Sequence, residues 1–590
     1  MSHINSNHEA LEVEIREGLR SLIQNSTMKT ETEIILPASV QRYWNSLRRA
    51  QFYTEQKWYD LTWDNSDIMK DYLIVMSILI DARIGCWEKF REIFIDKKRN
   101  DSGLPYPHDV LTSNDFLGLS NGKDFYAKQW MYCPLMIKEQ AEPHKLTGME
   151  CERRFPFIGE EKNIGHGATG IVYKQAIAAG CLEYQPPRSS VNHKSKFVAC
   201  KRVQHDQIET VEFENLQHLR GLLATHDRIM VNIATIIQDL PKAGTVHYIL
   251  YDLAAYDLNE FLNQVPNSRE KEHRRRSDTA PPGRNGSEHW NAADLIKESQ
   301  HLADALDFLH HRLYNDKRVT MAHNDLKPEN ILIFYPDAPG GRRYPVGQWK
   351  IADFGLAKIK DQRREPENSK AGRIDERNRF QTLSPDRGTR SPEHIDVTHR
   401  RTRSTSVVSI RSMSITKSKR DPGRWSPPEV EGKDEGQLNP RSGDIWAFGC
   451  VLAAVLAFGV DPPLVAELTS ECEIPDRLDQ RFYDVETKKI KTSVSKWLSS
   501  LHTTHEHKLR STGTQWVNDV ATLILEKILL KETQDRLKAG SIRDQLEDIH
   551  KSMQNEMAKW RGQAETDFSE QLESPKHDTP RLNFPDAGAN

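Results

Sequence analysis

The sequence predicts an α+β protein in which a β-rich part lies between two helical parts. Residues 35–150 hold several helical patterns rich in Trp, Tyr and Phe. From about Phe155, glycine clusters and short β-branched runs appear, and these favour strands joined by turns. Further along the chain, long helical patterns take over, for example over 293–313. We therefore expect a small sheet-based unit followed by a larger helical one.

The composition excludes several classes of protein. The chain has 590 residues and a mass of 67.9 kDa, which is more than one domain at about 100–200 residues per domain. Lys and Arg number 82 against 85 Asp and Glu, so the protein is neither a globally basic nucleic-acid binder nor a globally acidic chain. The mean hydropathy of −0.69 is typical of a globular protein with long polar stretches.

The cysteines and the apolar runs predict a cytoplasmic or nuclear protein. The seven cysteines are widely spaced and form no C-x-x-C pair, which argues against disulfides and zinc. The N-terminus lacks the charge pattern of a signal peptide. The runs Tyr72–Ile80 and Ile445–Val460 are shorter than the roughly 20 residues that span a bilayer. We expect both runs to form buried helices, with no membrane partner.

Polar segments divide the chain further. A polar N-terminal segment covers 1–34 and includes a possible amphipathic helix over 11–23, and residues 102–124 carry the turn residues of a loop. Residues 263–291 and 359–420 are expected to be disordered inserts, because they hold too few apolar side chains to offset the entropy of ordering. A polar tail is expected over 551–590.

A glycine-rich loop is the first candidate for binding chemistry. Glycines let the backbone approach phosphate oxygens and donate N–H groups. A Rossmann unit would start a helix at the third glycine, whereas the β-branched and aromatic residues that follow here favour a second strand. The glycine pattern therefore predicts a β-hairpin that covers a bound nucleotide. The alternative is an ordinary glycine-containing hairpin that binds no ligand. Its candidate residues are Ile164, Gly165, His166, Gly167, Ala168, Thr169, Gly170 and Val172.

Lys201 is the second candidate. It lies in a strand-like run, Phe197–Val203, where an inward-pointing ammonium must meet a charge or a phosphate. The helical pattern that follows, from Ile208 to Leu223, offers Glu212 as its partner, or Glu214 if the register slips by half a turn. The alternative is a strand-edge lysine whose charged end lies in water.

A third set of residues follows the predicted helix 293–313. Asp325 can accept the proton of a hydroxyl, Lys327 can reach a phosphoryl group, and Asn330 can ligate a metal through its amide oxygen. Asp353 follows a predicted strand, and its carboxylate suits Mg²⁺, which prefers oxygen ligands.

Together these motifs resemble the eukaryotic protein kinase family, serine/threonine type, over residues 155–550. GHGATG is similar to the glycine-rich loop, VACK to the strand lysine, HNDLKPEN to the catalytic loop, and DFG is intact. The resemblance implies a bilobal kinase fold after the helical N-terminal region. The small β-rich N-lobe with one main helix would cover 155–252 and the large helical C-lobe 253–550. It also implies ATP and Mg²⁺ as cofactors and proteins with Ser or Thr as substrates.

The resemblance also assigns roles. Lys201, held by Glu212 or Glu214, would bind the α- and β-phosphates, and Asp353 and Asn330 would hold Mg²⁺. Asp325 would take the hydroxyl proton and Lys327 would stabilise the moving phosphoryl group. The stretch Tyr248–Leu262 resembles the hinge, where Asp252 to Ala254 would contact adenine through backbone atoms and Asp257 would approach the ribose.

Two further motifs resemble elements of the C-lobe. Ser426–Glu429 resembles the APE motif, whose glutamate pairs with a late arginine, here Arg536. Asp444-Ile445-Trp446 with Gly449 resembles the D-x-W-x-x-G of the central helix.

The chain departs from the family pattern at three places. Asn324 replaces the arginine that usually binds a phosphorylated activation loop, the segment between Asp353 and Glu429 is much longer than usual, and residues 177–196 stretch the gap before Lys201. The N-terminal helical region is similar in layout to that of kinase-like proteins of filamentous fungi.

The insert over 359–420 holds 16 Lys and Arg residues against 8 Asp and Glu residues and many Ser and Thr residues. Ser384-Pro385 and Ser391-Pro392 suit proline-directed kinases, so we expect upstream kinases to phosphorylate the insert and reduce its charge. A solvated linker is the alternative, and a nucleic-acid partner is unlikely.

Rival functions remain open at this point. A pseudokinase scaffold would bind partners without chemistry, but such proteins usually lack the lysine, the catalytic acid or a metal ligand. A choline-type small-molecule kinase would lack the Pro-Pro-Glu and D-x-W-x-x-G elements. Residues 35–150 could be an adaptor, and are most simply a core that packs on itself or against the kinase.

Overall fold

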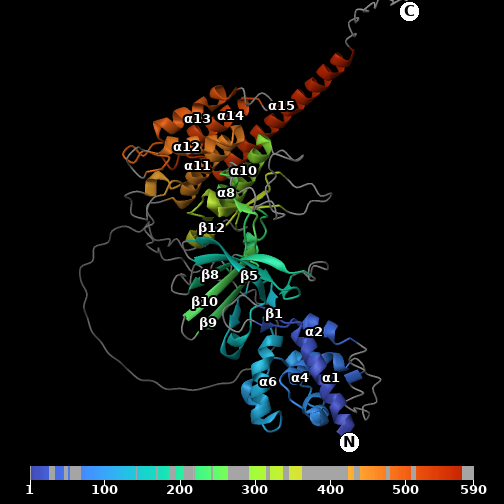
Figure 1. Cartoon of the computed structure of the whole chain (residues 1–590). Coiled ribbons are helices and arrows are strands. Elements are labelled where there is room, and N and C mark those ends of the chain that lie inside the picture. The colour runs from blue at the N-terminus through green and yellow to red at the C-terminus, as the bar shows by residue number, and fades with distance from the viewer. Residues whose placement is uncertain are drawn as a thin grey trace, which may run out of the picture.

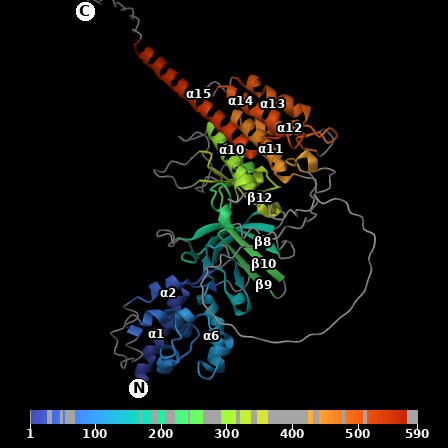
Figure 2. The same ribbon diagram turned by 180° about the vertical axis from the view of Figure 1, so that it is seen from behind.

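The computed structural model consists of three parts arranged in a row (Figure 1). The N-terminal helical region lies at one end, a β-sheet lobe lies in the middle, and a helical lobe lies at the other end; the view from behind shows the same order (Figure 2). The structure describes residues 2–25, 33–45, 51–52, 68–140, 142–167, 170–184, 194–204, 217, 220–240, 244–263, 291–313, 319–335, 345–361, 423–430, 439–473, 479–506 and 513–573.

The N-terminal region is a helical unit with its own aromatic core. Trp44, Phe52, Phe90 and Phe94 are fully buried there, and the indole of Trp44 donates to Ser77 at 2.8 Å. Its helices are α1 (Ser2–Arg20), α2 (Pro37–Tyr43), α4 (Leu73–Asp81), α5 (His108–Leu111) and α6 (Gly118–Tyr132), with short 3-10 or π turns at Ile68–Tyr72, Trp87–Lys89, Arg91–Ile95, Asp101–Gly103 and Gly148–Glu152. The short strands β1 (Gln24–Asn25) and β2 (Glu33–Ile34) pair with each other.

One part of the expected loop over 102–124 is wrong, because α6 begins at Gly118 within it. The residues at the start of this helix have low helix propensity, which is why the sequence favours a loop. Gly122 is buried against α5, where an added Cβ would lie 2.4 Å from the carbonyl oxygen of Leu111. Close packing of the two helices therefore outweighs local propensity.

The middle lobe is a six-stranded sheet in the order β4-β9-β10-β8-β6-β5. Its strands are β5 (Phe157–Gly167), β6 (Gly170–Ile177), β8 (Lys196–Gln204), β9 (Ala234–Leu240) and β10 (Gly244–Asp252), with β4 (His144–Leu146) added from the N-terminal region. Strand β4 runs parallel to β9 at the edge, and β3 (Ile137–Lys138) pairs with β7 (Leu182–Glu183) in the stretch before Lys201.

These added strands make the N-terminal region a continuous part of the small lobe. Leu135, Ile137 and Leu146 share one buried cluster with Val198 and Cys200 of β8. Side chains alternate along a strand, so Val198 and Cys200 lie on the face opposite Lys201. The segment 135–146 therefore covers the back of the strand that carries Lys201.

The helical lobe is built around one long apolar helix, α11 (Pro440–Val460). By length and composition α11 could cross a membrane, but 89% of its most apolar window is buried inside the protein, as expected for a core helix. Around it lie α8 (Leu258–Leu262), α10 (Ala292–Asp307) with the π turn Phe308–Arg312, α12 (Leu464–Cys472), α13 (Thr492–Thr504), α14 (Gln515–Leu523) with the π turn Ile524–Ile528, and α15 (Ala539–Glu573).

Short strands carry the loops between the two lobes. They are β11 (Tyr256–Asp257), β12 (Val319–Ala322), β13 (Ile331–Phe334), β14 (Gln348–Ile351) and β15 (Lys358–Asp361), with 3-10 turns at Pro328–Asn330, Phe354–Leu356 and Pro428–Val430. Strand β13 pairs with β11 and β14, and β12 pairs with β15. The inserts near 263–291 and 359–420 fall almost entirely outside the described residues.

The packing of β4 gives a testable prediction. Leu146→Ala should lower the free energy of opening of β9 by about 2–5 kcal/mol, because it removes a buried side chain from the core that the two regions share. Hydrogen exchange of the β9 amides measures this opening. Lys145→Ala, at the exposed neighbouring position, is the control and should leave exchange unchanged. Equal protection in both variants would show that the N-terminal region does not support the sheet.

Candidate active site

The glycine-rich loop is a β-hairpin, as the sequence predicts. Strand β5 ends at Gly167 and β6 begins at Gly170, with the two glycines paired across the turn. A Cβ at Gly170 would lie 2.3 Å from the carbonyl oxygen of Arg202, so only glycine fits there. Ala168 and Thr169 lie outside the described residues. Val172 pairs with Lys201 on the adjacent strand, which places the hairpin over this lysine.

Lys201 lies in β8 and contacts Asp353 of the other lobe. The Nζ–Oδ1 distance is 2.8 Å. Burial alone would raise the pKa of Asp353, but the charge and hydrogen bond of Lys201 outweigh burial and lower the pKa below its ordinary value. Asp353 is therefore held as a carboxylate. Glu212 and Glu214 lie outside the described residues, so the predicted pairing of either with Lys201 stays a prediction.

Asp325, Lys327 and Asn330 form one hydrogen-bonded group. The ammonium of Lys327 lies 3.0 Å from Asp325 Oδ2, and Asn330 Nδ2 donates to the same oxygen at 3.0 Å and to the Asp325 carbonyl at 2.7 Å. Because the amide nitrogen of Asn330 is engaged in this way, its carbonyl oxygen is the atom that can ligate a metal.

The hairpin of β13 and β14 brings Asn330 close to Asp353. Ile331 pairs with Ile351 across the hairpin. The backbone amide of Ala352 donates a hydrogen bond to the backbone carbonyl of Asn330 at 2.8 Å. Asp353 follows directly in a left-handed conformation, with φ of +59°, and accepts a hydrogen bond from Gly355 N at 3.4 Å. Since Asp353 also contacts Lys201, a chain of contacts between neighbouring residues joins Lys201, Asp353, Asn330 and Asp325.

The buried carboxylate of Asp444, in α11, binds the backbone of the loop that carries Asp325. Its side chain is 1% exposed and accepts hydrogen bonds from the amides of His323 and Asn324, both at 2.8 Å. His310 Nε2 lies 2.9 Å from the same carboxylate, and His323 Nε2 lies 2.9 Å from the Ala352 carbonyl. The loop with Asp325 and the strand end with Asp353 therefore share one support.

Asn324 takes the place of the family's usual arginine and makes a direct contact instead. Its side-chain amide donates to the carbonyl of Leu356 at 3.0 Å, which ties the catalytic loop to the segment after Asp353. Its φ is +61°, a conformation that asparagine tolerates better than most residues.

Glu429 and Arg536 form the ion pair that the motif resemblance implies. The two hydrogen bonds measure 2.7 and 2.8 Å, and the side chains are 7% and 1% exposed. Arg536 also donates to the carbonyls of Ser442 and Leu530. Breaking such a buried pair from one side costs about 3–5 kcal/mol, because it leaves an unpaired buried charge. The pair therefore fixes the short segment 423–430 to the helical lobe.

The predicted hinge begins at Asp252, the last residue of β10, whose side chain pairs with Lys196 at 2.6 Å. The predicted backbone contacts of Asp252 to Ala254 with adenine stay a prediction. Asp257 pairs with Leu332 of β13 and accepts from the Glu260 amide at 2.8 Å, capping α8. Burial, followed by the charges of Glu260 and Glu329, raises the pKa of Asp257 to about 6.

Two supporting residues were not assigned roles from the sequence. His310 could have been noted from its position at the end of the predicted helix 293–313, and Asp444 from its motif. Asp353 as the direct partner of Lys201 had no signal in the sequence, because the two residues are 152 positions apart.

The donor set fits Mg²⁺ held together with a nucleotide. Among the described residues, no group of three or more His, Cys, Asp or Glu side chains could hold a metal alone. Asp353 supplies a carboxylate and Asn330 an amide oxygen, and Mg²⁺ takes its remaining ligands from phosphates and water in sites of this kind.

A family model for the protein kinase domain matches residues 159–546, which is more than half of the chain. The chain therefore belongs to the protein kinase family. The β-sheet lobe and the helical lobe are its N-lobe and C-lobe, and the helical region before them lies outside the match. No curated protein matches the sequence.

Proposed function

We propose that this protein is a serine/threonine kinase that transfers the γ-phosphoryl group of ATP, with Mg²⁺, to hydroxyl groups of proteins. The observation that supports it most strongly is that Lys201 contacts Asp353, while Lys327 and Asn330 both contact Asp325. Lys-Pro-Glu-Asn at 327–330 is the serine/threonine form of the loop, which supports the choice of substrate.

Each residue has one task in this reaction. The transition state of phosphoryl transfer is loose, so the protein chiefly positions groups and neutralises charge. Lys201 binds the α- and β-phosphates. When Mg²⁺ is bound, Asp353 and Asn330 would hold it, and it would supply positive charge to offset that of the phosphate oxygens. Asp325 accepts a hydrogen bond from the substrate hydroxyl and then takes its proton, and Lys327, at 3.0 Å from Asp325, stabilises the phosphoryl group.

We also propose that the protein works in the cytoplasm or the nucleus, and that upstream kinases phosphorylate the insert over 359–420. All seven cysteines are free thiols, which supports a reducing compartment. Imaging of a fluorescent fusion tests the location. Phosphopeptide mapping of an active preparation should find phosphate in the insert, and a bare insert would end that part of the proposal.

Replacement of the catalytic acid is the direct test of phosphoryl transfer. Asp325→Asn should lower turnover by about 100- to 10,000-fold, because the hydroxyl loses its proton acceptor, while ATP affinity stays nearly unchanged. Site-resolved mass spectrometry of a reaction with MgATP and a generic basic protein measures the products and shows whether Ser and Thr are the acceptors.

Asp109→Asn, an exposed position in the N-terminal region, is the matched control and should behave as wild type. If wild type binds MgATP but transfers no phosphate, the protein is a pseudokinase scaffold. Near-normal transfer by Asp325→Asn would instead refute the role assigned to this carboxylate.

The raised pKa of Asp257 predicts how ATP binding depends on pH. With a pKa of about 6, the carboxyl is ionised at pH 7.5 and can accept a hydrogen bond from the ribose, whereas at pH 5 it is mostly protonated. The KM for ATP should therefore rise as pH falls through about 6. Asp257→Asn should bind more weakly at neutral pH and lack this inflection. Parallel pH profiles for the two proteins would show that Asp257 does not meet the nucleotide.

A further inference from the structure

The loop over 226–230 binds strand β14, which ends at Ile351, two residues before Asp353. The amide of Met230 donates to the Ile351 carbonyl and the Ile351 amide donates to the Arg228 carbonyl, both at 2.8 Å. The loop thus adds to the edge of β14 as a short parallel bridge, at a point two residues before Asp353. A shift of the loop therefore moves the end of β14 and with it Asp353, the residue that holds Mg²⁺ in the proposed function.

Helix α10 binds this loop and the same strand through a buried glutamate. Glu298 is 1% exposed, pairs with the guanidinium of Arg228, and accepts the amide of Trp349 in β14 at 2.9 Å. His301 Nδ1 lies 2.7 Å from another nitrogen of Arg228. The side chain of Glu298 therefore joins helix α10 to both the loop over 226–230 and strand β14.

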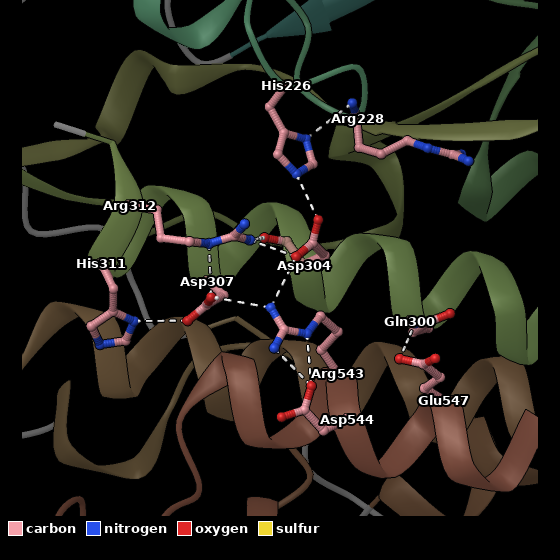
Figure 3. A network of polar contacts seen from close by, with 10 residues as sticks. All are labelled: His226, Arg228, Gln300, Asp304, Asp307, His311, Arg312, Arg543, Asp544 and Glu547. Carbon is pink, nitrogen blue, oxygen red and sulfur yellow. Dashed lines mark hydrogen bonds and ion pairs between the residues drawn. The ribbon is translucent and has the colours of Figure 1, made fainter. Parts of the chain in front are cut away.

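One turn further along α10, Asp304 binds the start of the loop (Figure 3). The backbone amide of Arg228 donates to His226 Nδ1 at 3.2 Å, so the other ring nitrogen, Nε2, carries the proton and donates to Asp304 Oδ2 at 3.0 Å. The imidazole thereby joins the backbone of the loop to the carboxylate of the helix.

The second oxygen of Asp304 is bound by two arginines from different elements. Arg312, in the π turn after α10, lies 2.5 Å away, and Arg543 of α15 lies 3.2 Å away. Arg543 points between Asp304 and Asp307, as Figure 3 shows, at 3.5 Å from the latter. The hydrogen bond from His226, followed by the two arginines, lowers the pKa of Asp304, so the residue is a carboxylate at neutral pH.

Helix α15 is well placed to act through this contact. Ile542, Leu546, Ile549 and Met553 are buried in the C-lobe core and fix the first half of the helix along α10. The helix then continues past the other helices of the lobe, as both overall views show. From α15, Arg543 forms ion pairs with Asp304 and Asp307 of α10.

We propose that Asp304 is a positioning residue for Asp353, and that helix α15 holds Asp304 in place through Arg543. The path runs from Arg543 to Asp304, to His226 and the loop, to Ile351, and on to Asp353. It rests on the proposed function only in that Asp353 is taken as a Mg²⁺ ligand. Without the carboxylate at 304, the loop keeps its contact with Glu298 but loses its contact with the next part of α10, and the end of β14 gains freedom relative to Asn330 and Lys201.

The experiment compares four variants of the full chain: Asp304→Ala, Arg543→Ala, Arg543→Lys and Lys551→Ala. The last is the matched control, because Lys551 lies two turns further along α15, is 61% exposed and pairs with Glu547. Hydrogen exchange of residues 348–356 without nucleotide reports the freedom of the strand end. The Mg²⁺ concentration for half-maximal ATP binding, measured by calorimetry, reports the position of Asp353.

Asp304→Ala and Arg543→Ala should speed exchange over 348–356 and raise the required Mg²⁺ concentration. For Asp304→Ala we expect the required Mg²⁺ concentration to rise about tenfold. This is the low end of the effect seen for residues that support a metal ligand, because two contacts lie between the 304 side chain and the strand that leads to Asp353. Arg543→Ala should have a smaller effect, since Arg312 stays on the carboxylate. Arg543→Lys should recover part of the loss, and Lys551→Ala should match wild type.

Unchanged exchange and unchanged Mg²⁺ dependence in Asp304→Ala would overturn the proposal. If that variant does not fold, Arg543→Ala decides in the same way, because it removes only one of the two arginine contacts. A wild-type protein that binds no MgATP would refute the proposed function, whereas the exchange measurement would still test whether Asp304 holds the strand.

Discussion

The ion pair between Lys201 and Asp353 is the contact on which the active site depends. The lysine comes from the sheet of the N-lobe and the aspartate from a strand end in the C-lobe, so the pair exists only when both lobes are in place. Burial alone would raise the pKa of Asp353, but the charge of Lys201 lowers it, so the pair keeps the carboxyl group ionised. A MgATP complex would insert its phosphates and metal where the two charges now meet.

Most of the surrounding structure can be understood as support for this pair. Behind Lys201, the N-terminal region covers β8 with Leu135, Ile137 and Leu146 and adds β4 to the sheet. Behind Asp353, Asp444 orients the catalytic loop and the loop over 226–230 holds β14. The region before the kinase lobes therefore packs on the strand that carries Lys201, which argues against a detachable adaptor at the N-terminus.

The residues that meet in the candidate active site could be picked out from the sequence, because the chemistry proposed for them demands particular residue types at short spacings. Asp325, Lys327 and Asn330 lie within six positions, and Asp353 ends an apolar strand. Contacts between distant segments could not be predicted in this way. Nothing local marks the pairing of β4 with β9, or the contact between Asp304 and Arg543, which are 239 residues apart. Helix α6 was partly missed because its glycine-rich start is stabilised only by packing against α5.

The central claim is that Lys201, Asp325, Asn330 and Asp353 surround one magnesium-bound triphosphate. Calorimetric titration of ATP into the wild-type chain, once with Mg²⁺ and once with a chelator, tests it most directly. We expect saturable binding of one nucleotide with Mg²⁺ and much weaker binding when the metal is removed, because the phosphate charge then lacks its counter-ion close to the Asp353 carboxylate. Absence of binding under both conditions, or equal affinity in both, would contradict the account.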